Sequence, residues 1–353
     1  MKAEVIVNLG GGKGVGRSRF VTISPMSLPM NRRRVLKTLF CSSALMNLNL
    51  SAFGQESPGS GSLDLLALGD FGTGDERQKA VARGMARYAA SLGKKPDGVI
   101  FLGDNFYGPM PGGLTSPRWQ TGFSQVYPGE DFPGPCWAIF GNHDYHDNRG
   151  GELVQLGYAK SLNRSTRWTF PAKFYRVELP QVTMLMLDTN WESINRRVHG
   201  DGRPCWMQED EREAQLLWLE RELSGKRAPF TIVCGHHPIY SDANHGDTKE
   251  LVEILGPMLE KHGVHAYFCG HDHDLQHMEL EGLRTSFVLS GGGGARLYEG
   301  DEHPRKGSSV FDVHGFTHIS IAGDGMTIRH IDPNGKIVHA FTKNTRHEWK
   351  ILA

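Results

Sequence analysis

Five short segments of this 353-residue chain carry histidines, carboxylates and one phenol in an order that suits a pair of metal ions. The segments are Gly69-Asp70-Phe71-Gly72, Gly103-Asp104-Asn105-Phe106-Tyr107, Gly141-Asn142-His143-Asp144, Gly235-His236-His237-Pro238 and Gly270-His271-Asp272-His273. Each follows a short apolar run that is typical of a buried strand. Because ligands of open α/β sheets bind beyond the carboxyl ends of the strands, we expect the five segments to meet at one site.

The chemistry that suits such a site is hydrolysis of a phosphate ester. A phosphate ester repels anionic nucleophiles, so two cations that neutralise its oxygens and acidify a bound water favour attack near neutral pH. Asp104 is the candidate carboxylate bridge between the two ions. The expected further ligands are Asp70, Tyr107 and His273 for the first ion, and Asn142, His236 and His271 for the second.

Tyr107 indicates which metal the first site holds. A phenol with a solution pKa of about 10 becomes a ligand only when a strongly Lewis-acidic ion displaces its proton. Ferric iron (Fe3+) fits this requirement, whereas magnesium and zinc fit poorly. The second set of ligands is less anionic and suits a divalent ion, and because imidazole binds iron, zinc and manganese alike, Fe2+, Zn2+ and Mn2+ remain alternatives.

Two histidines are candidate catalytic groups. After attack by a metal-activated hydroxide, the leaving alcohol needs a proton. His143 follows Asn142, and His245 lies nine residues after His236. Histidine has an unperturbed pKa of about 6.5, so proton donation by either residue predicts an acidic pH optimum. We expect His143 to contact the phosphate and His245 to be the general acid, although either assignment is open.

Neighbouring residues are expected to support these roles. Asp144 and Asp272 are candidates to fix imidazole tautomers, and His237 to orient its neighbours or to pack. The run from Ser290 to Gly294 would let a loop approach the substrate, but glycine runs usually indicate only flexibility.

The elements that position these groups alternate between strand-like and helix-like runs. Strands are expected at 63–68, 99–102, 136–140, 174–179, 183–187, 230–234, 265–269, 318–321, 327–331 and 336–341, and helices at 76–92, 209–223 and 247–261. A proline-rich loop separates the second and third strands, and Asp324-Gly325 and Asn334-Gly335 predict tight hairpins. We therefore expect an α/β (α+β) fold, a four-layer αββα sandwich of two mixed β-sheets flanked by helices.

In this order the five segments resemble the purple acid phosphatases of the calcineurin-like metallophosphoesterases, and most closely the small tartrate-resistant acid phosphatases. The resemblance runs from Leu63 to Phe341. It implies a ferric site of Asp70, Asp104, Tyr107 and His273 beside a divalent site of Asp104, Asn142, His236 and His271. Most members of the wider superfamily have a histidine at the position of Gly72, and Tyr107 replaces that ligand here.

The resemblance implies an acid phosphatase that acts on phosphomonoesters. A phosphodiesterase of the same superfamily, or a phosphate- or metal-binding protein without turnover, remains an alternative. Lysine plus arginine balance aspartate plus glutamate at 39 each, so no long-range field attracts nucleic acid and a small phosphate ester is the expected substrate. We expect Cys234 and Cys269 to be buried free thiols, whereas a bridge involving Cys136 or Cys205 and the oligomeric state remain open.

The chain is expected to divide into four parts. Residues 1–54 form an N-terminal extension in which Asn31-Arg32-Arg33-Arg34-Val35-Leu36-Lys37, an apolar stretch and Ala52-Phe53-Gly54 resemble a twin-arginine export signal, with Met30 as a candidate start. A Gly/Ser-rich linker (55–62), the catalytic domain (63–342) and a C-terminal tail (343–353) follow. No run of about 18 apolar residues follows this signal, so we expect no membrane span in the mature chain. The export signal itself predicts a periplasmic or extracellular protein.

Overall fold

The computed structural model describes residues 61–161, 166–301 and 303–352. The expected export signal and all but the last two residues of the linker lie outside these residues. Within them, no helix has the length and apolar character that crossing a bilayer requires. The four described cysteines are free and buried, as expected for Cys234 and Cys269.

One of two mixed β-sheets has eight strands in the order β15-β14-β13-β12-β1-β2-β3-β4. Its strands are β1 (Leu63–Leu68), β2 (Gly98–Phe101), β3 (Cys136–Ala138), β4 (Trp168–Thr169), β12 (Phe316–Ala322), β13 (Gly325–Ile331), β14 (Ile337–Asn344) and β15 (Trp349–Ile351). Strands β1 to β4 pair in parallel, and β12 to β15 form antiparallel hairpins. The turn between β13 and β14 contains Asn334-Gly335 as predicted, whereas the turn between β12 and β13 is Gly323-Asp324, one residue before the predicted Asp324-Gly325, because Gly325 already pairs with Ala322.

The other sheet has seven strands in the order β11-β9-β10-β8-β7-β6-β5. They are β5 (Tyr175–Glu178), β6 (Val182–Met186), β7 (Phe230–Cys234), β8 (Ala266–Cys269), β9 (Leu275–Met278), β10 (Ser286–Ser290) and β11 (Ser308–Phe311). The inner strands β6, β7, β8 and β10 run in parallel, whereas β5, β9 and β11 are antiparallel to their neighbours.

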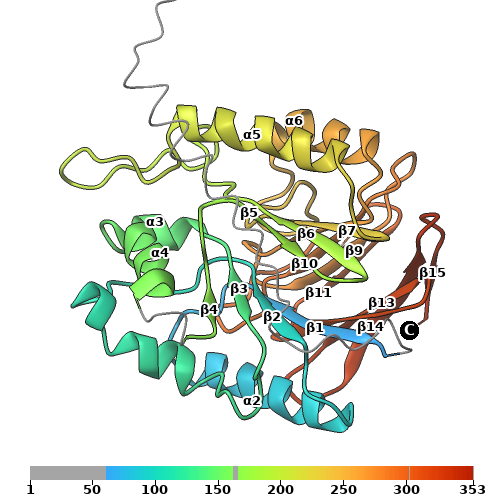
Figure 1. Cartoon of the computed structure of the whole chain (residues 1–353), viewed down its shortest axis with the longest axis horizontal. Coiled ribbons are helices and arrows are strands. Elements are labelled where there is room, and N and C mark those ends of the chain that lie inside the picture. Colours follow the sequence, from blue (N-terminus) through green and yellow to red (C-terminus); the bar gives the residue numbers. More distant parts are fainter. Residues whose placement is uncertain (1–60, 162–165, 302, 353) are drawn as a thin grey trace, which may run out of the picture. The chain divides into compact units, whose positions relative to one another are not determined.

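Helices cover the outer faces of both sheets. Figure 1 shows α5 (Glu209–Ser224) and α6 (Lys249–Lys261) along the seven-stranded sheet and α2 (Glu76–Ser91) along the eight-stranded sheet. Asp75 caps α2 by accepting hydrogen bonds from the backbone N–H groups of Arg77 and Gln78. Apolar side chains of both sheets, such as Leu66 and Ile232, share one buried cluster. The predicted four-layer αββα sandwich is therefore confirmed.

The proline-rich interval contains helical turns that the sequence did not predict. They are η1 (Gly113–Thr115) and the π-helical turn η2 (Trp119–Ser124). Two further helices that were not predicted, α3 (Asn142–His146) and α4 (Gly151–Ser161), follow β3. Trp119 and Phe123 are nearly fully buried, and both rings pack edge to face against Trp168. These aromatic contacts order a stretch whose prolines and glycines suggested a loop.

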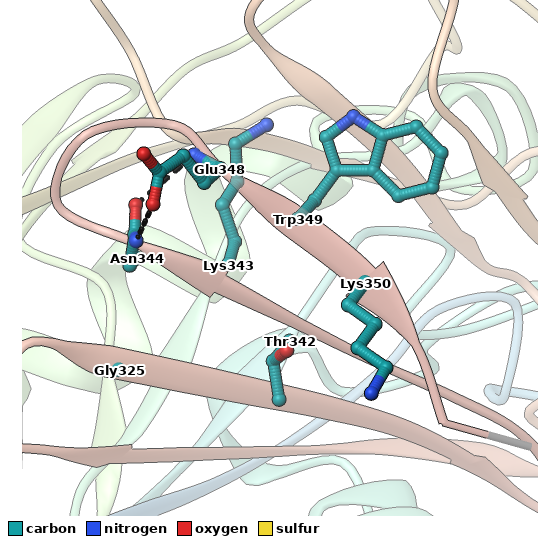
Figure 2. A pocket seen from close by; sticks show the side chains of 7 residues that line it. All are labelled: Gly325, Thr342, Lys343, Asn344, Glu348, Trp349 and Lys350. Carbon is teal, nitrogen blue, oxygen red and sulfur yellow. Dashed lines mark hydrogen bonds between the residues drawn. The ribbon is translucent and has the colours of Figure 1, made fainter.

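The eight-stranded sheet also continues beyond residue 342, into the segment expected to be a tail. Strand β15 pairs with β14 because the chain turns back at residues 345–348. A shallow hollow lies at this hairpin, lined by Gly325, Thr342, Lys343, Asn344, Glu348, Trp349 and Lys350 (Figure 2). The Asn344 side-chain amide donates a hydrogen bond of 2.7 Å to Glu348. None of the predicted metal ligands lines the hollow, so the predicted metal site lies in another part of the fold.

Candidate metal centre

The predicted ligands follow the carboxyl ends of parallel strands in both sheets. Asp70, Asp104 and Asn142 come after β1, β2 and β3 of the eight-stranded sheet. His236 follows β7 and the segment from His271 to His273 follows β8 of the seven-stranded sheet. The fold thereby brings five distant loops together where the two sheets meet, as the sequence predicts.

Three of the side chains form one group of donors. The hydroxyl oxygen of Tyr107 lies 3.4 Å from Oδ1 of Asp70 and 3.2 Å from Nε2 of His273. The distance between His273 Nε2 and Asp70 Oδ1 is 3.5 Å. Neighbouring ligands of an ion with bonds of about 2.1 Å stand roughly 3 to 3.5 Å apart, so these three atoms fit around one ion.

A second group forms beside the first. Oδ1 of Asn142 lies 3.0 Å from both Nε2 of His236 and Nδ1 of His271, and these two nitrogens are 3.3 Å apart. Oδ1 of Asp104 lies 3.6 Å from His236 Nε2. Donor atoms of Asp70, Asp104 and His236 all lie within 4.8 Å of one another, so Asp104 is positioned between the two groups.

Hydrogen bonds behind the ligands fix which imidazole nitrogen faces the site. Nδ1 of His236 donates to the carbonyl of Leu102 at 2.8 Å, and Nδ1 of His273 donates to the carbonyl of Arg296 at 2.6 Å. Each Nε2 therefore keeps its lone pair for a metal ion. Burial also lowers the pKa of His273 to about 4 and lowers that of His236, which favours the neutral rings that metals bind.

The electrostatics of the site require cations. Asp70 and Asp104 are fully buried, and burial together with the charge of Asp104 raises the pKa of Asp70 well above its usual value. Burial and the same two carboxylates raise the pKa of Tyr107. Throughout the part of the chain that the structure describes, no lysine or arginine forms an ion pair with either carboxylate. Buried anionic oxygens without a cationic side chain fit a site for metal ions.

The backbone at three of the ligands is strained. Asp70, Asp104 and His271 have φ angles of 59°, 53° and 75°, a region that residues other than glycine rarely adopt. Each such residue costs about 1–3 kcal/mol and persists only where the surroundings hold it. Here Asp70 accepts a 2.8 Å hydrogen bond from the backbone N–H of His271, and Asp104 a 2.9 Å bond from that of His143.

Glycines bring the backbone close to these carboxylates. A Cβ atom at Gly291 would lie 1.9 Å from the carbonyl oxygen of Asp272 and 2.9 Å from Oδ2 of Asp70. A Cβ atom at Gly141 would lie 2.1 Å from Oδ1 of Asp104. The run from Ser290 to Gly294 therefore packs directly behind the site, which explains its glycines better than the flexibility that the sequence suggested.

Both candidate catalytic histidines lie beside a ligand and reach solvent. The His245 ring lies beside that of His271, with centroids 4.1 Å apart and planes tilted by 35°, and its Nδ1 donates to Asp272 at 2.6 Å. The His143 ring lies 4.5 Å from that of Tyr107. The two side chains are 36% and 30% exposed, so a bound substrate can reach them.

Asp147 is a partner of His143 that the sequence analysis did not identify. Nδ1 of His143 donates to Asp147 at 2.9 Å, across one turn of α3. Burial opposes the protonated form of His143, but the hydrogen bond with Asp147 and the charge of Asp104 outweigh it and raise its pKa. The spacing i, i+4 within a helix would have revealed this pair, but no helix was predicted there.

Two supporting residues differ in their contacts. The expectation that Asp272 holds an imidazole agrees with its bond to His245, whereas among the described residues no hydrogen bond joins Asp144 to a histidine. Instead Asp144 accepts hydrogen bonds from the backbone N–H groups of Gly141 and Asn105, at 2.8 and 3.1 Å, and so joins two ligand loops. His237 is buried and its Nδ1 lies 2.9 Å from the hydroxyl of Thr189, which agrees with a packing role.

Comparisons with known proteins agree with this geometry. Residues 63–275 match the calcineurin-like phosphoesterase family. Human tartrate-resistant acid phosphatase type 5 is 32% identical over 302 residues, which cover 78% of this chain and 88% of the human protein. Purple acid phosphatase 7 of Arabidopsis thaliana is 30% identical over 323 residues, which cover 88% of this chain and 96% of the plant protein.

Two solved structures share the fold at lower identity. A purple acid phosphatase from yellow lupin (Lupinus luteus) seeds has a TM-score of 0.63 at 16% identity, with 81% of this chain and 54% of that chain covered. A Plasmodium protein described as the anchor in the inner membrane complex has a TM-score of 0.67 at 19% identity, with 79% and 87% covered. Because similar folds carry different functions, these two matches speak for the fold alone.

Proposed function

The chain belongs to the purple acid phosphatases of the calcineurin-like phosphoesterase family, and from this premise we propose that it is an exported acid phosphatase that hydrolyses phosphomonoesters at a centre of two metal ions. The observation that carries the proposal is the convergence of seven donor side chains in two adjoining groups, with Asp104 between them. Lone motifs of this kind are commonplace, but a buried cluster without a cationic side chain is not.

Each residue has a defined part in the proposal. Asp70, Tyr107 and His273 would hold an Fe3+ ion, Asn142, His236 and His271 would hold a divalent ion (Fe2+, Zn2+ or Mn2+), and Asp104 would serve both. When bound, the ions supply Lewis acidity that activates a water molecule and neutralises the phosphoryl oxygens.

The two half-exposed histidines act on the substrate from opposite ligand groups. His143 contacts the phosphoryl group beside Tyr107, and Asp147 favours its protonated form. His245 donates a proton to the leaving-group oxygen. Its Nδ1–H is fixed by Asp272, so the proton comes from Nε2. An acidic pH optimum follows because the donor must be protonated before bond cleavage.

Turnover tests the proposal directly. The metal-loaded chain should release inorganic phosphate from 4-nitrophenyl phosphate and from glycerol phosphate at mildly acidic pH, and a chelator that removes the metals should abolish the release. His245→Ala should slow the alkyl ester by about 10²-fold or more, the usual contribution of a general acid. The same variant should slow the activated aryl ester less, because its leaving group needs no proton. Equal losses on both esters would contradict the role of His245.

The same assays separate the alternatives. Faster cleavage of bis(4-nitrophenyl) phosphate than of the monoester would favour a phosphodiesterase. A metal-loaded protein that is coloured and releases no phosphate would favour a binding protein without turnover. Tyr107→Phe tests the ferric assignment, because loss of the phenolate ligand should remove any visible charge-transfer band.

Export is proposed from the paired arginines at 32–34 and the small-residue pattern at 52–54. Substitution of Arg32 and Arg33 by lysine should retain the protein in the cytoplasm of a host that has twin-arginine export. Secretion that is unchanged by this substitution would contradict the proposed signal.

A further inference from the structure

Three rings that supply predicted ligands are each covered by one half-exposed ring. His143 lies against Tyr107, with centroids 4.5 Å apart and planes tilted by 52°, and His245 lies against His271, with centroids 4.1 Å apart and planes tilted by 35°. The third covering ring is Tyr298, which stacks on His273 at 4.2 Å with an interplanar angle of 12°. The first two covering rings are the candidate catalytic histidines, whereas Tyr298 has had no role so far.

Tyr298 lies in the segment between β10 and β11 and is half-buried. Besides its stack on His273, its ring stands edge to face against His245, with centroids 5.2 Å apart and an angle of 74°. Tyr298 therefore contacts both a predicted ligand of the first ion and the proposed proton donor. Among the described residues none hydrogen-bonds its hydroxyl, and its ring contacts are those with His273 and His245.

We propose that Tyr298 is a specificity-determining residue whose ring forms the wall against which the organic group of the substrate packs, and that it favours aromatic phosphate esters over aliphatic ones. The inference rests on the proposed function, since His245 is the residue that protonates the leaving-group oxygen. The organic group begins at that oxygen, so it must lie beside His245. Two rings lie next to His245, the predicted metal ligand His271 and Tyr298, and of these Tyr298 is the one that is not a predicted ligand.

The size of the preference follows from the energetics of aromatic pairs. An offset or edge-to-face aromatic pair contributes binding free energy in addition to that from the apolar area it buries. This additional free energy changes an affinity by about 2- to 10-fold. We therefore expect Tyr298 to tighten binding of an aromatic ligand by that factor relative to an aliphatic ligand of similar size. Phosphate contacts, which are the same for both ligands, should not change.

The test compares phenylphosphonate with cyclohexylphosphonate, which carry the same phosphonate head group and six ring carbons each and are not hydrolysed. Their dissociation constants are measured by calorimetry on the metal-loaded full chain and on Tyr298→Leu and Tyr298→Phe. The leucine variant should lose the 2- to 10-fold preference for the phenyl ligand, and the phenylalanine variant should keep it. Metal content should stay at the wild-type value in both variants.

Tyr158→Leu is the matched control. Tyr158 is also half-buried and stacks on a ring, that of Trp119, at 3.6 Å, but it touches no predicted ligand. Its replacement should leave the preference unchanged.

Several outcomes would overturn the inference. One is a Tyr298→Leu variant that keeps the wild-type preference for the phenyl ligand. Another is a Tyr298→Leu variant that binds both phosphonates equally more weakly, or that loses metal, because Tyr298 would then only support His273. A wild-type protein that binds the two phosphonates equally tightly would also overturn the inference. Because binding is measured without turnover, these outcomes are separate from a failure of phosphate release, which would contradict the proposed function itself.

Discussion

The carboxylate of Asp272 holds His245 at two points, since its Oδ1 lies 3.1 Å from the backbone nitrogen of His245 and 2.6 Å from Nδ1 of the imidazole. The carboxylate is fully buried and accepts a further bond from the hydroxyl of Ser241. It therefore fixes both the position and the tautomer of His245, which leaves Nε2 as the nitrogen that exchanges a proton with a substrate.

Asp272→Asn should weaken the hydrogen bonds that fix the position and tautomer of His245, without removing metal. Loss of a residue that orients a functional imidazole commonly costs 10- to 100-fold, and we expect kcat for an alkyl phosphate to fall by about that factor. The rate on 4-nitrophenyl phosphate should fall less. Steady-state kinetics with metal analysis check the expectation, and Asp210→Asn, at an exposed position in the first turn of α5, is the control. An unchanged alkyl rate would mean that Asp272 does not act through His245.

Gly291→Ala should damage the site although alanine adds only one methyl group. That methyl would lie 1.9 Å from the carbonyl oxygen of Asp272, so the loop behind Asp70 must move. We expect metal content and activity to fall by at least 10-fold, because misplacing a ligand by about 1 Å has effects of this size. Gly200→Ala is the matched control, since a methyl group there meets no atom within 4 Å. Similar behaviour of the two variants would contradict the close packing inferred at Gly291.

A charge cluster at the start of β1 links stability to pH. The buried Asp64 carboxylate lies 2.7 Å from Lys94 and 2.8 Å from Nε2 of His318. Burial opposes its charged form, but hydrogen bonds from Lys94, Ser62 and His318 outweigh burial and hold the pKa of Asp64 below its usual value. A lowered pKa stabilises the fold fully above the unfolded value of about 3.9, and this stabilisation declines progressively as the pH falls from that value through the lower pKa of the folded state.

Asp64→Asn should accordingly lower the free energy of unfolding at pH 6 by about 1–2 kcal/mol, a modest value because Lys94 is partly exposed. Below about pH 4 the difference between the variant and the wild type should shrink, because the Asp64 carboxylate of the unfolded wild type then takes up a proton while that of the folded protein stays ionised. Urea unfolding at a series of pH values measures both quantities. A difference that stays constant from pH 6 to pH 3 would show that the carboxylate charge is not the cause.

The sequence was sufficient to predict the fold and the meeting of the ligand loops. Short apolar runs before Asp70, Asp104 and His236 marked parallel strands, and the geometry of such sheets brings the ends of their strands to one place. Local patterns of this kind depend on nearby residues, which the sequence displays directly. The two hairpin turns were predicted for the same reason, the one at Asn334-Gly335 in place and the one at Gly323-Asp324 displaced by one residue.

Features that arise from contacts between distant segments could not be predicted. The strained backbone of Asp70 and His271 depends on a hydrogen bond between loops 201 residues apart. Tyr298 lies 25 residues after His273, in a segment without regular structure, and no periodic pattern marks its stack on that ring. Asp144 looked like a partner for histidine by composition, but the folded loops offered it backbone N–H groups instead.

Metal analysis of the purified chain tests the central claim most directly. The account predicts two metal ions per chain, one of them iron, and their loss in Asp104→Ala, because that carboxylate lies between the two groups of donors. Asp210→Ala should keep both ions. A wild-type protein that binds fewer than two ions when both metals are supplied, or an Asp104→Ala variant that retains both, would contradict the proposed two-metal centre.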